Sequence, residues 1–312
     1  MAERDDTVAG GGAGNKRQIT NVAAGTEGTD AGNKDQLGGV AATAENTRKY
    51  FQASGSEDSD AGALAEGDSA LAAGEAANAI GDGATALGGG AAAIAAQATA
   101  VGFNSLATGV NASAVGTNAQ ASGEDSAALG SGAVASETST TATGAGAQAT
   151  AVYSTANGAE AVASGAQSLS TGFRAAASAD GATAVGGYSE ASGRLGSALG
   201  YGTVASGANS TAAGVFATAT GAGAVAVGEA SEATGDESVA VGGSTYFGLI
   251  TSRASGYGAS AYGAGAWATE DYATAIGWNA WADGAQSTAL GASATANGSN
   301  SVALGAASQA DR

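Results

Sequence analysis

Carboxylates and hydroxyls are the side chains of this sequence with an evident capacity for chemistry. The chain of 312 residues has no His and no Cys, which removes imidazole bases, thiol nucleophiles, disulfides and the metal sites built on those ligands. Acidic residues mostly occupy the two-residue turns between units, as at Glu124-Asp125 and Asp236-Glu237, where such residues are expected anyway. Their oxygens are conceivable calcium ligands, but neither the nine-residue calcium repeat nor the phosphate-loop motif occurs. We therefore expect no catalytic residue, no metal site, no cofactor and no enzyme activity.

The charge balance narrows the range of partners. The chain has 28 acidic and 10 basic residues, a net charge of −18, which disfavours binding to nucleic acid or to an anionic membrane. Its surface either recognises basic patches of a partner or simply keeps the protein soluble. No apolar run reaches the roughly 20 residues of a membrane span. We expect no nucleic-acid partner and no membrane insertion by this segment.

The elements that position these residues follow a seven-residue repeat. Stepping by seven from Gly67 to Gly305 gives 35 positions, and Gly occupies all but Ala95, Glu137, Ala151, Ala179, Leu249 and Glu270. Small residues precede each Gly at alternate positions, as in Ala98-Thr-Ala-Val-Gly102, which is the spacing of a strand. A heptad coiled coil is excluded because each Gly would cost a helix about 1 kcal/mol. Each unit is predicted to be a strand of about five residues and a two-residue turn.

A fourteen-residue period lies over the shorter one. Aliphatic residues that precede the Gly, such as Val101 and Val115, are fourteen residues or multiples of fourteen apart, whereas Thr108 and Ser122 stand midway between such positions. Two strands therefore make one turn of a parallel β-roll, with the small residues inside. The 35 units predict 17.5 turns. The fold class is all-β.

The outward aliphatic residues should stack into one apolar stripe, and such a stripe marks an interface. An interior of Ala and Gly buries little apolar area, so we expect an obligate oligomer joined along this stripe. The predicted interface residues are Val101, Val115, Leu129, Val185, Leu199, Val227, Val241, Ile276, Leu290 and Leu304.

This pattern resembles the head of trimeric autotransporter adhesins of the YadA type over about residues 61–309. The resemblance implies a left-handed parallel β-roll in a homotrimer. Upstream, residues 17–37 resemble the neck of the same family, with Gly32 standing where the family prefers Val. The residues that match the neck motif are Arg17, Gln18, Ile19, Asn21, Val22, Gly25, Thr29, Asp30, Asn33 and Leu37.

The resemblance also orders the chain. We expect the end of a preceding head or junction over 1–13, the neck over 14–37, and a short trimeric coiled coil with its connector over 38–54. The helix should be frayed at Gly38 and Gly39. The roll follows over 55–242, an insert over 243–275 and the C-terminal part of the roll over 276–312. The two ends look like halves of one junction, as in an internal passenger segment that carries neither signal peptide nor anchor.

The insert is predicted from the aromatics and the phase of the stripe. Eight of the 16 aromatics, including all three Trp, lie in 246–281, and Val241 and Ile276 are two and a half turns apart. A loop must therefore leave the roll. Its aromatics either pack the loop against the roll or form a ligand surface. The candidates for that surface are Arg253, Tyr257, Tyr262 and Trp267.

Two functions are compatible with these features. The first is a cell-surface adhesin segment that attaches to host matrix, cells or other surfaces, with an extracellular-matrix protein or a glycan as partner. Such a segment would be the passenger of an outer-membrane-anchored virulence protein. The second is a structural fibre spacer, in a phage tail fibre or an engineered fibre, without a ligand of its own.

Overall fold

The computed structural model describes residues 19–28, 32–50, 61–245 and 250–312. The chain divides into two compact units, Met1–Ser54 and Gly55–Arg312. Each unit is described by itself.

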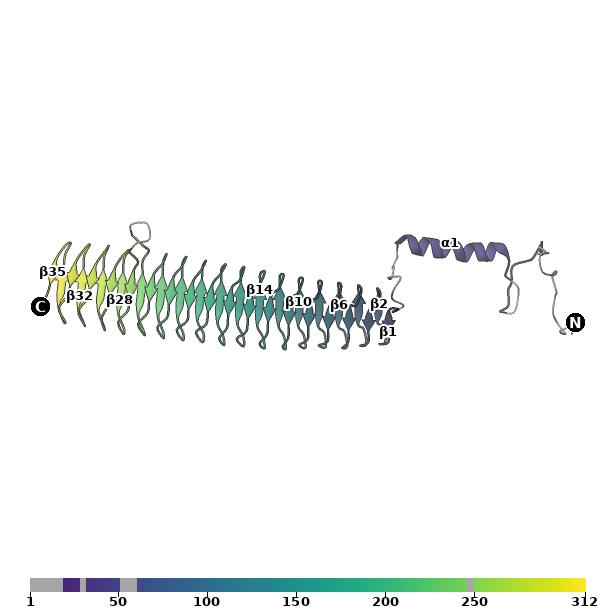
Figure 1. The fold of residues 1–312 in the computed structure, drawn as a ribbon, viewed down its shortest axis with the longest axis horizontal. Helices are drawn as coiled ribbons and strands as arrows, with labels where there is room; N and C mark the ends of the chain where they lie inside the picture. The colour runs from purple at the N-terminus through teal and green to yellow at the C-terminus, as the bar shows by residue number, and fades with distance from the viewer. Residues whose placement is uncertain (1–18, 29–31, 51–60, 246–249) are drawn as a thin grey trace. The chain divides into compact units, whose positions relative to one another are not determined.

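The second unit is a parallel β-solenoid of about 17 turns (Figure 1). Each strand pairs in parallel with the strand fourteen residues further along, as in Val101↔Val115 and Ala107↔Ala121. Consecutive strands alternate between two sheets, so each turn contributes one strand to each sheet. The predicted all-β parallel roll with two strands per turn is confirmed.

One sheet contains the odd-numbered strands, each two residues long. They are β1 Leu64–Ala65, β3 Asn78–Ala79, β5 Ala92–Ala93, β7 Leu106–Ala107, β9 Gln120–Ala121, β11 Val134–Ala135, β13 Gln148–Ala149, β15 Val162–Ala163, β17 Ala176–Ala177, β19 Glu190–Ala191, β21 Val204–Ala205, β23 Thr218–Ala219, β25 Glu232–Ala233, β27 Arg253–Ala254, β29 Trp267–Ala268, β31 Trp281–Ala282, β33 Thr295–Ala296 and β35 Gln309–Ala310.

The other sheet contains the even-numbered strands, each three residues long. They are β2 Leu71–Ala73, β4 Thr85–Leu87, β6 Thr99–Val101, β8 Ser113–Val115, β10 Ala127–Leu129, β12 Thr141–Thr143, β14 Thr155–Asn157, β16 Leu169–Thr171, β18 Thr183–Val185, β20 Ser197–Leu199, β22 Thr211–Ala213, β24 Val225–Val227, β26 Val239–Val241, β28 Ser260–Tyr262, β30 Thr274–Ile276, β32 Thr288–Leu290 and β34 Val302–Leu304.

The strands are shorter than the five residues expected, because the turns take up most of each unit. In the turn that starts at Gly109, the amide N–H of Ala112 donates to the Gly109 carbonyl oxygen at 3.2 Å. The third turn residue, Asn111, has a φ of 57°, in the left-handed region that a strand cannot contain. The same conformation recurs seven residues away, at Asn104 and Asn118. Turn chemistry therefore limits each strand to two or three residues.

The core consists of Ala side chains stacked in columns. Ala98 and Ala100 on one side of a turn, and Ala107 on the other, are fully buried. The largest fully buried side chains of the described residues are Thr140 and Thr203. Because no bulky side chain separates them, the two sheets approach each other closely and the roll is thin.

The Gly residues of the repeat form two sets, and Gly is favoured in each set for a different structural reason. The Gly that follows each even-numbered strand has a positive φ, 128° at Gly102 for example, a conformation that L side chains rarely adopt. The Gly after each odd-numbered strand lacks this φ, but a Cβ at Gly109 would overlap the carbonyl oxygen of Gly123 in the next turn. The described exceptions to the repeat all belong to the second set: Ala95, Glu137, Ala151, Ala179 and Glu270.

The predicted insert is shorter than expected. Val241 of β26 pairs with Tyr262 of β28, 21 residues later, so one extra seven-residue unit leaves the stack, as expected from the stripe phase. Thr245 and Ile250 form an antiparallel bridge within it, and the chain leaves the stack beside β28 (Figure 1). The expected insert of 243–275 is wrong in extent, because β27 to β30 are regular strands of the roll. The described residues that lie outside the strands between β26 and β27 are 242–245 and 250–252.

The first unit contains one described helix, α1 Lys34–Tyr50. The amide N–H of Gln36 donates to Asn33 Oδ1 at 2.9 Å, and the Asn33 N–H donates to Gln36 Oε1 at 3.1 Å. This reciprocal capping box starts the helix before Gly38 and Gly39. The helix is therefore continuous through the two Gly, and the expectation of a frayed start is wrong. Within the described residues, no helix has the length and apolar character needed to cross a membrane.

Candidate functional site

The ten residues predicted as an interface lie in one column on the outer face of the even-numbered sheet. Each is the third residue of its strand, and neighbours pair in register, as Val185 does with Leu199 and Ile276 with Leu290. Register pairing places successive members of such a column about 4.8 Å apart along the roll. Val115 and Leu129 are each 39% exposed although their strands lie between others in the sheet. The column is interrupted by Thr143, Asn157, Thr171, Ala213 and Tyr262.

The four residues predicted as a ligand surface do not form one surface. Arg253 and Trp267 are register partners on the outer face of the odd-numbered sheet. Tyr257 lies in the turn between the sheets, where its ring packs against Tyr272. Tyr262 stands in the aliphatic column between Val241 and Ile276. Residues only a few positions apart point in different directions, because each short strand is followed at once by a turn.

Trp267 has a partner that the sequence pattern did not assign to it. Its indole stacks on Trp281 of the next turn, with ring centroids 5.1 Å apart and planes inclined by 8°. Trp267 Nε1 donates to the Thr251 carbonyl oxygen at 2.8 Å, which ties the emerging loop to the sheet. Trp281 Nε1 donates to Asn279 Oδ1 at 3.2 Å. The fourteen-residue spacing of the two Trp is the feature of the sequence that could have revealed this stack.

A second aromatic cluster lies along the turns that follow the even-numbered strands. Phe173, Tyr188, Tyr201 and Phe216 contact one another in succession, edge to face. Arg174 forms an ion pair with Glu160 and lies 5.1 Å from the centre of the Phe173 ring. The Glu160 carboxylate raises the pKa of the Arg174 guanidinium. We name these four rings the aromatic ladder. The aromatic ladder was not predicted from the sequence, although its members all stand at turn positions.

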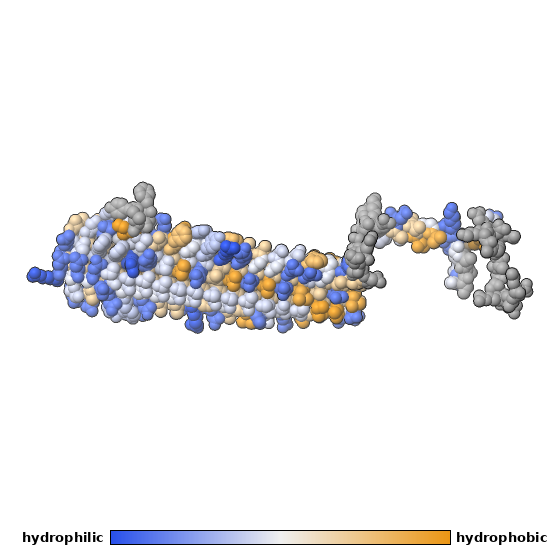
Figure 2. Space-filling model, in the orientation of Figure 1, coloured by the Kyte–Doolittle hydropathy of each residue, from blue (hydrophilic) through white to orange (hydrophobic). Residues whose placement is uncertain are grey.

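Exposed hydrophobic residues are unevenly distributed along the roll. In the view of Figure 2, hydrophobic residues gather toward the end that contains β1 to β6, and the C-terminal end is mostly hydrophilic. Leu64, Leu71, Ile80 and Ile94 are exposed large hydrophobics of this end. In the described part of the chain, no group of three or more His, Cys, Asp and Glu could hold a metal ion.

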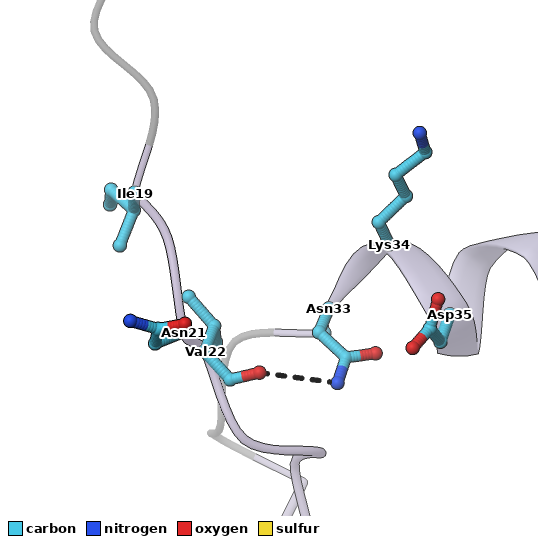
Figure 3. Close-up of a pocket in the computed structure, with 7 residues that line it drawn as sticks. Ile19, Asn21, Val22, Asn33, Lys34 and Asp35 are labelled. Carbon is cyan, nitrogen blue, oxygen red and sulfur yellow. Dashed lines mark hydrogen bonds between the residues drawn. The ribbon is translucent and has the colours of Figure 1, made fainter.

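A hollow of about 380 Å³ lies in the first unit, between residues 19–22 and the start of α1 (Figure 3). Asn33 Nδ2 donates to the Val22 carbonyl oxygen at 3.3 Å across it, and Gln36 exchanges hydrogen bonds with the backbone of Gly25. The structure thus brings together Val22, Gly25 and Asn33 of the predicted neck. Ile19 and Leu37 are exposed. Arg17, Gln18, Thr29 and Asp30 lie outside the described residues.

A family model described as "YadA head domain repeat (2 copies)" matches most of the roll. The matched residues are 65–91, 79–105, 93–119, 107–133, 135–161, 163–189, 191–217, 219–245, 254–280 and 282–308. The chain belongs to the YadA head family. The comparison with curated proteins finds no match for it.

The YadA repeats agree with the geometry of the roll. Two successive matches end at residue 245 and start at residue 254, so the interval between them lies where the extra unit leaves the stack. YadA heads are repeats of adhesin-type trimeric autotransporter passengers, which is a family of fibres and adhesins and not of enzymes. The resemblance inferred from the Gly repeat is confirmed.

Proposed function

We propose that this chain is a cell-surface adhesin segment whose roll assembles as a homotrimer along the aliphatic column and attaches to host matrix, cells or other surfaces. It would be the passenger of an outer-membrane-anchored protein. The observation that carries the proposal is the column itself, in which runs of partly exposed Val, Leu and Ile stack in register on one face of a YadA-type roll.

The thin core supports assembly. The interior of the roll is built from Ala, so each turn buries little apolar area relative to the backbone that it orders. Covering the column would remove further apolar surface from water, at roughly 25 cal/mol for each Å². A threefold arrangement gives every copy the same buried face and leaves the odd-numbered sheet and the turns accessible.

The first unit supports the same assembly. Leu37 and Val40 of α1 are 70% and 67% exposed, although both are apolar residues inside a helix. Their contact with equivalent residues of two other copies would form the short coiled coil expected after the neck. In this proposal residues 14–37 form the neck, and the part of α1 that follows residue 37 belongs to the coiled coil and connector over 38–54.

A structural fibre spacer is the second candidate. It is favoured by the monotony of the surface, since the first residue of most even-numbered strands is Ser or Thr, as at Ser113, Thr141 and Thr183. Such a spacer would form the same trimer and would have no ligand. Trimer formation therefore tests the assembly, and attachment separates adhesin from spacer.

Assembly is tested by sedimentation equilibrium on the full chain. We expect a trimer for the wild type and a loss of association for Val115→Asp, which places a charge in the column. Val134→Asp is the matched control, because Val134 of β11 stands on the outer face of the other sheet. A wild-type protein that is a folded monomer would overturn the proposal, as would equal behaviour of the two variants.

Attachment is tested by surface binding of the purified trimer to collagen, fibronectin, laminin and intact epithelial cells. Binding to at least one of them is expected for an adhesin. A trimer that binds none of them supports the spacer function instead.

A further inference from the structure

A small notch beside Trp281 combines an aromatic face with uncharged polar groups. It has a volume of about 200 Å³ and is lined by Asn279, Trp281, Ser293 and Thr295. Sites for drug-sized ligands measure roughly 300–1,000 Å³, so this notch has room for a single ring. All four lining residues are partly exposed, and the notch opens at the surface of the roll.

The position of the notch follows from the stack of turns. Trp267 covers one face of the Trp281 indole, at a centroid distance of 5.1 Å. Thr295 is the register partner of Trp281 on the opposite side. The lining residues come from the turn of Trp281 and from the following turn, and none comes from the turn of Trp267. The notch therefore lies against the face of Trp281 that Trp267 leaves uncovered.

The indole in this notch is held in place before any ligand arrives. Trp281 Nε1 donates to Asn279 Oδ1, and the parallel contact with Trp267 fixes the plane of the ring. Trp267 is itself anchored by its hydrogen bond to the Thr251 carbonyl oxygen. An aromatic face held in this way loses little side-chain entropy on binding. Trp267 thus holds the Trp281 ring in place from the face opposite the notch.

The chemistry of the lining selects the class of ligand. The Asn279 amide and the Ser293 and Thr295 hydroxyls supply both donors and acceptors, and none of the four residues carries a charge. A cation would require carboxylates and an anion would require basic groups. A pyranose ring offers a face of C–H groups to an indole and a rim of hydroxyls to amide and hydroxyl partners.

We propose that this notch binds one hexopyranose unit of a glycan, with the sugar ring stacked on the free face of Trp281 and its hydroxyls bonded to Asn279, Ser293 and Thr295. The site lies on the outer face of the odd-numbered sheet and its adjoining turn, away from the aliphatic column. This inference rests on the proposed adhesin function and names the ligand class that one surface of the roll recognises.

The experiment titrates the full chain with the methyl pyranosides of glucose, galactose, mannose and N-acetylglucosamine, followed by Trp fluorescence and by saturation-transfer NMR. We expect at least one sugar to bind with a dissociation constant on the order of 1 mM, as suits a single ring with few contacts. Trp281→Ala should weaken binding by at least about tenfold, and Thr295→Val by about threefold.

Two variants keep the result interpretable. Trp278→Ala removes an exposed indole that is not among the four lining residues, although it precedes Asn279 in the chain, and it should bind the sugar as the wild type does. Trp281→Phe keeps a smaller aromatic face and should bind between the wild type and Trp281→Ala. Far-ultraviolet circular dichroism of each variant establishes that the roll is intact.

The outcomes separate this inference from the proposed function. If no sugar binds at about 50 mM, or if Trp281→Ala binds as the wild type does, the glycan site is overturned, whether or not the trimer attaches to matrix proteins. If a matrix protein binds through Trp281 while no sugar does, the ligand class is wrong. If a sugar binds through Trp281 but the trimer attaches to no cell or matrix protein, the sugar-binding site is supported and the adhesin function is rejected.

Discussion

Phe173 and Tyr188 meet edge to face, with ring centroids 5.3 Å apart and ring planes at 86°. Tyr188 makes a second contact of the same kind with Tyr201, at 5.6 Å, and Tyr201 continues to Phe216. The rings alternate between the first and second positions after the turn Gly, so that each ring reaches the next turn. The aromatic ladder thus joins four successive turns on the outside of a roll whose interior holds only small side chains.

Removing the centre of the ladder should destabilise the roll. Aromatic pairs contribute about 0.5–1.5 kcal/mol beyond the area they bury, and Tyr188→Ala removes two of them. We expect it to lower the free energy of unfolding by about 1–3 kcal/mol, measured by denaturant unfolding at constant protein concentration. Tyr153→Ala is the matched control, since Tyr153 stands at the same turn position with a similar φ of 60° and is 59% exposed. Equal losses in both variants would show that the ladder contributes nothing.

The two sets of Gly should respond differently to Ala. Gly102→Ala imposes a side chain on a φ of 128° and brings the Cβ to 2.7 Å from the Gly116 carbonyl oxygen. The backbone conformation alone costs about 1–3 kcal/mol. In Gly109→Ala the backbone φ is not strained, and the new Cβ only overlaps the Gly123 carbonyl oxygen. The chain already has Ala at two positions of the same set, Ala95 and Ala151, so the roll can accommodate this overlap. We expect the thermal midpoint to fall further for Gly102→Ala, and the reverse order would contradict the distinction between the two sets.

Buried Ser residues of the two sheets should have opposite effects. The Ser168 hydroxyl is buried without a hydrogen-bond partner in the described part of the chain, and Ala182 occupies the equivalent position one turn later. Ser168→Ala is expected to raise the free energy of unfolding by about 1–2 kcal/mol, because the unpaired hydroxyl is removed.

Ser189→Ala is the counterpart on the other sheet. The Ser189 hydroxyl donates to the Gly186 carbonyl oxygen at 2.8 Å, so its loss should lower the free energy of unfolding by about 1 kcal/mol. Denaturant unfolding of both variants in the same buffer measures the difference. A destabilised Ser168→Ala protein would mean that this hydroxyl has a partner.

Tyr257 should ionise at a higher pH than an ordinary tyrosine. The Glu237 carboxylate beside it, through a hydrogen bond and its negative charge, holds the pKa of the Tyr257 phenol above the usual value of 10.0. The neutral phenol is therefore favoured in the folded state. Its contribution to stability is present below about pH 10 and is lost as the pH rises through the folded-state pKa.

The shift is measured by ultraviolet absorbance titration of phenolate. The difference between the wild type and Tyr257→Phe isolates this one group among the eight Tyr. Glu237→Gln removes the carboxylate charge and should bring the pKa of Tyr257 back toward its usual value. An unchanged titration in Glu237→Gln would rule out Glu237 as the cause.

The periodicity of the sequence by itself determined the architecture. Small residues at alternate positions, a Gly every seven residues and an aliphatic residue every fourteen predict two strands per turn, an Ala interior and one outward column. The structure has all three, with Ala100 inside and Val101 outside as an example. Such inference succeeds because the same local geometry is repeated in every turn, so spacing along the chain translates directly into position in space. The half-turn shift between Val241 and Ile276 likewise predicted that a loop leaves the roll there, and the register of the strands shows that one seven-residue unit does so.

Only the tertiary structure decided which exceptional residues meet. Arg253, Tyr257 and Tyr262 are close in sequence and lie on different faces, whereas Trp267 and Trp281 are fourteen residues apart and stack. The capping box of Asn33 and Gln36, and the two causes of the Gly repeat, also required the backbone. The physical reason is that the sequence repeat describes only the geometry that all turns of the roll have in common. The contacts of a large side chain depend on the direction in which its own strand or turn points it, and on the neighbour that the stacking of turns brings beside it.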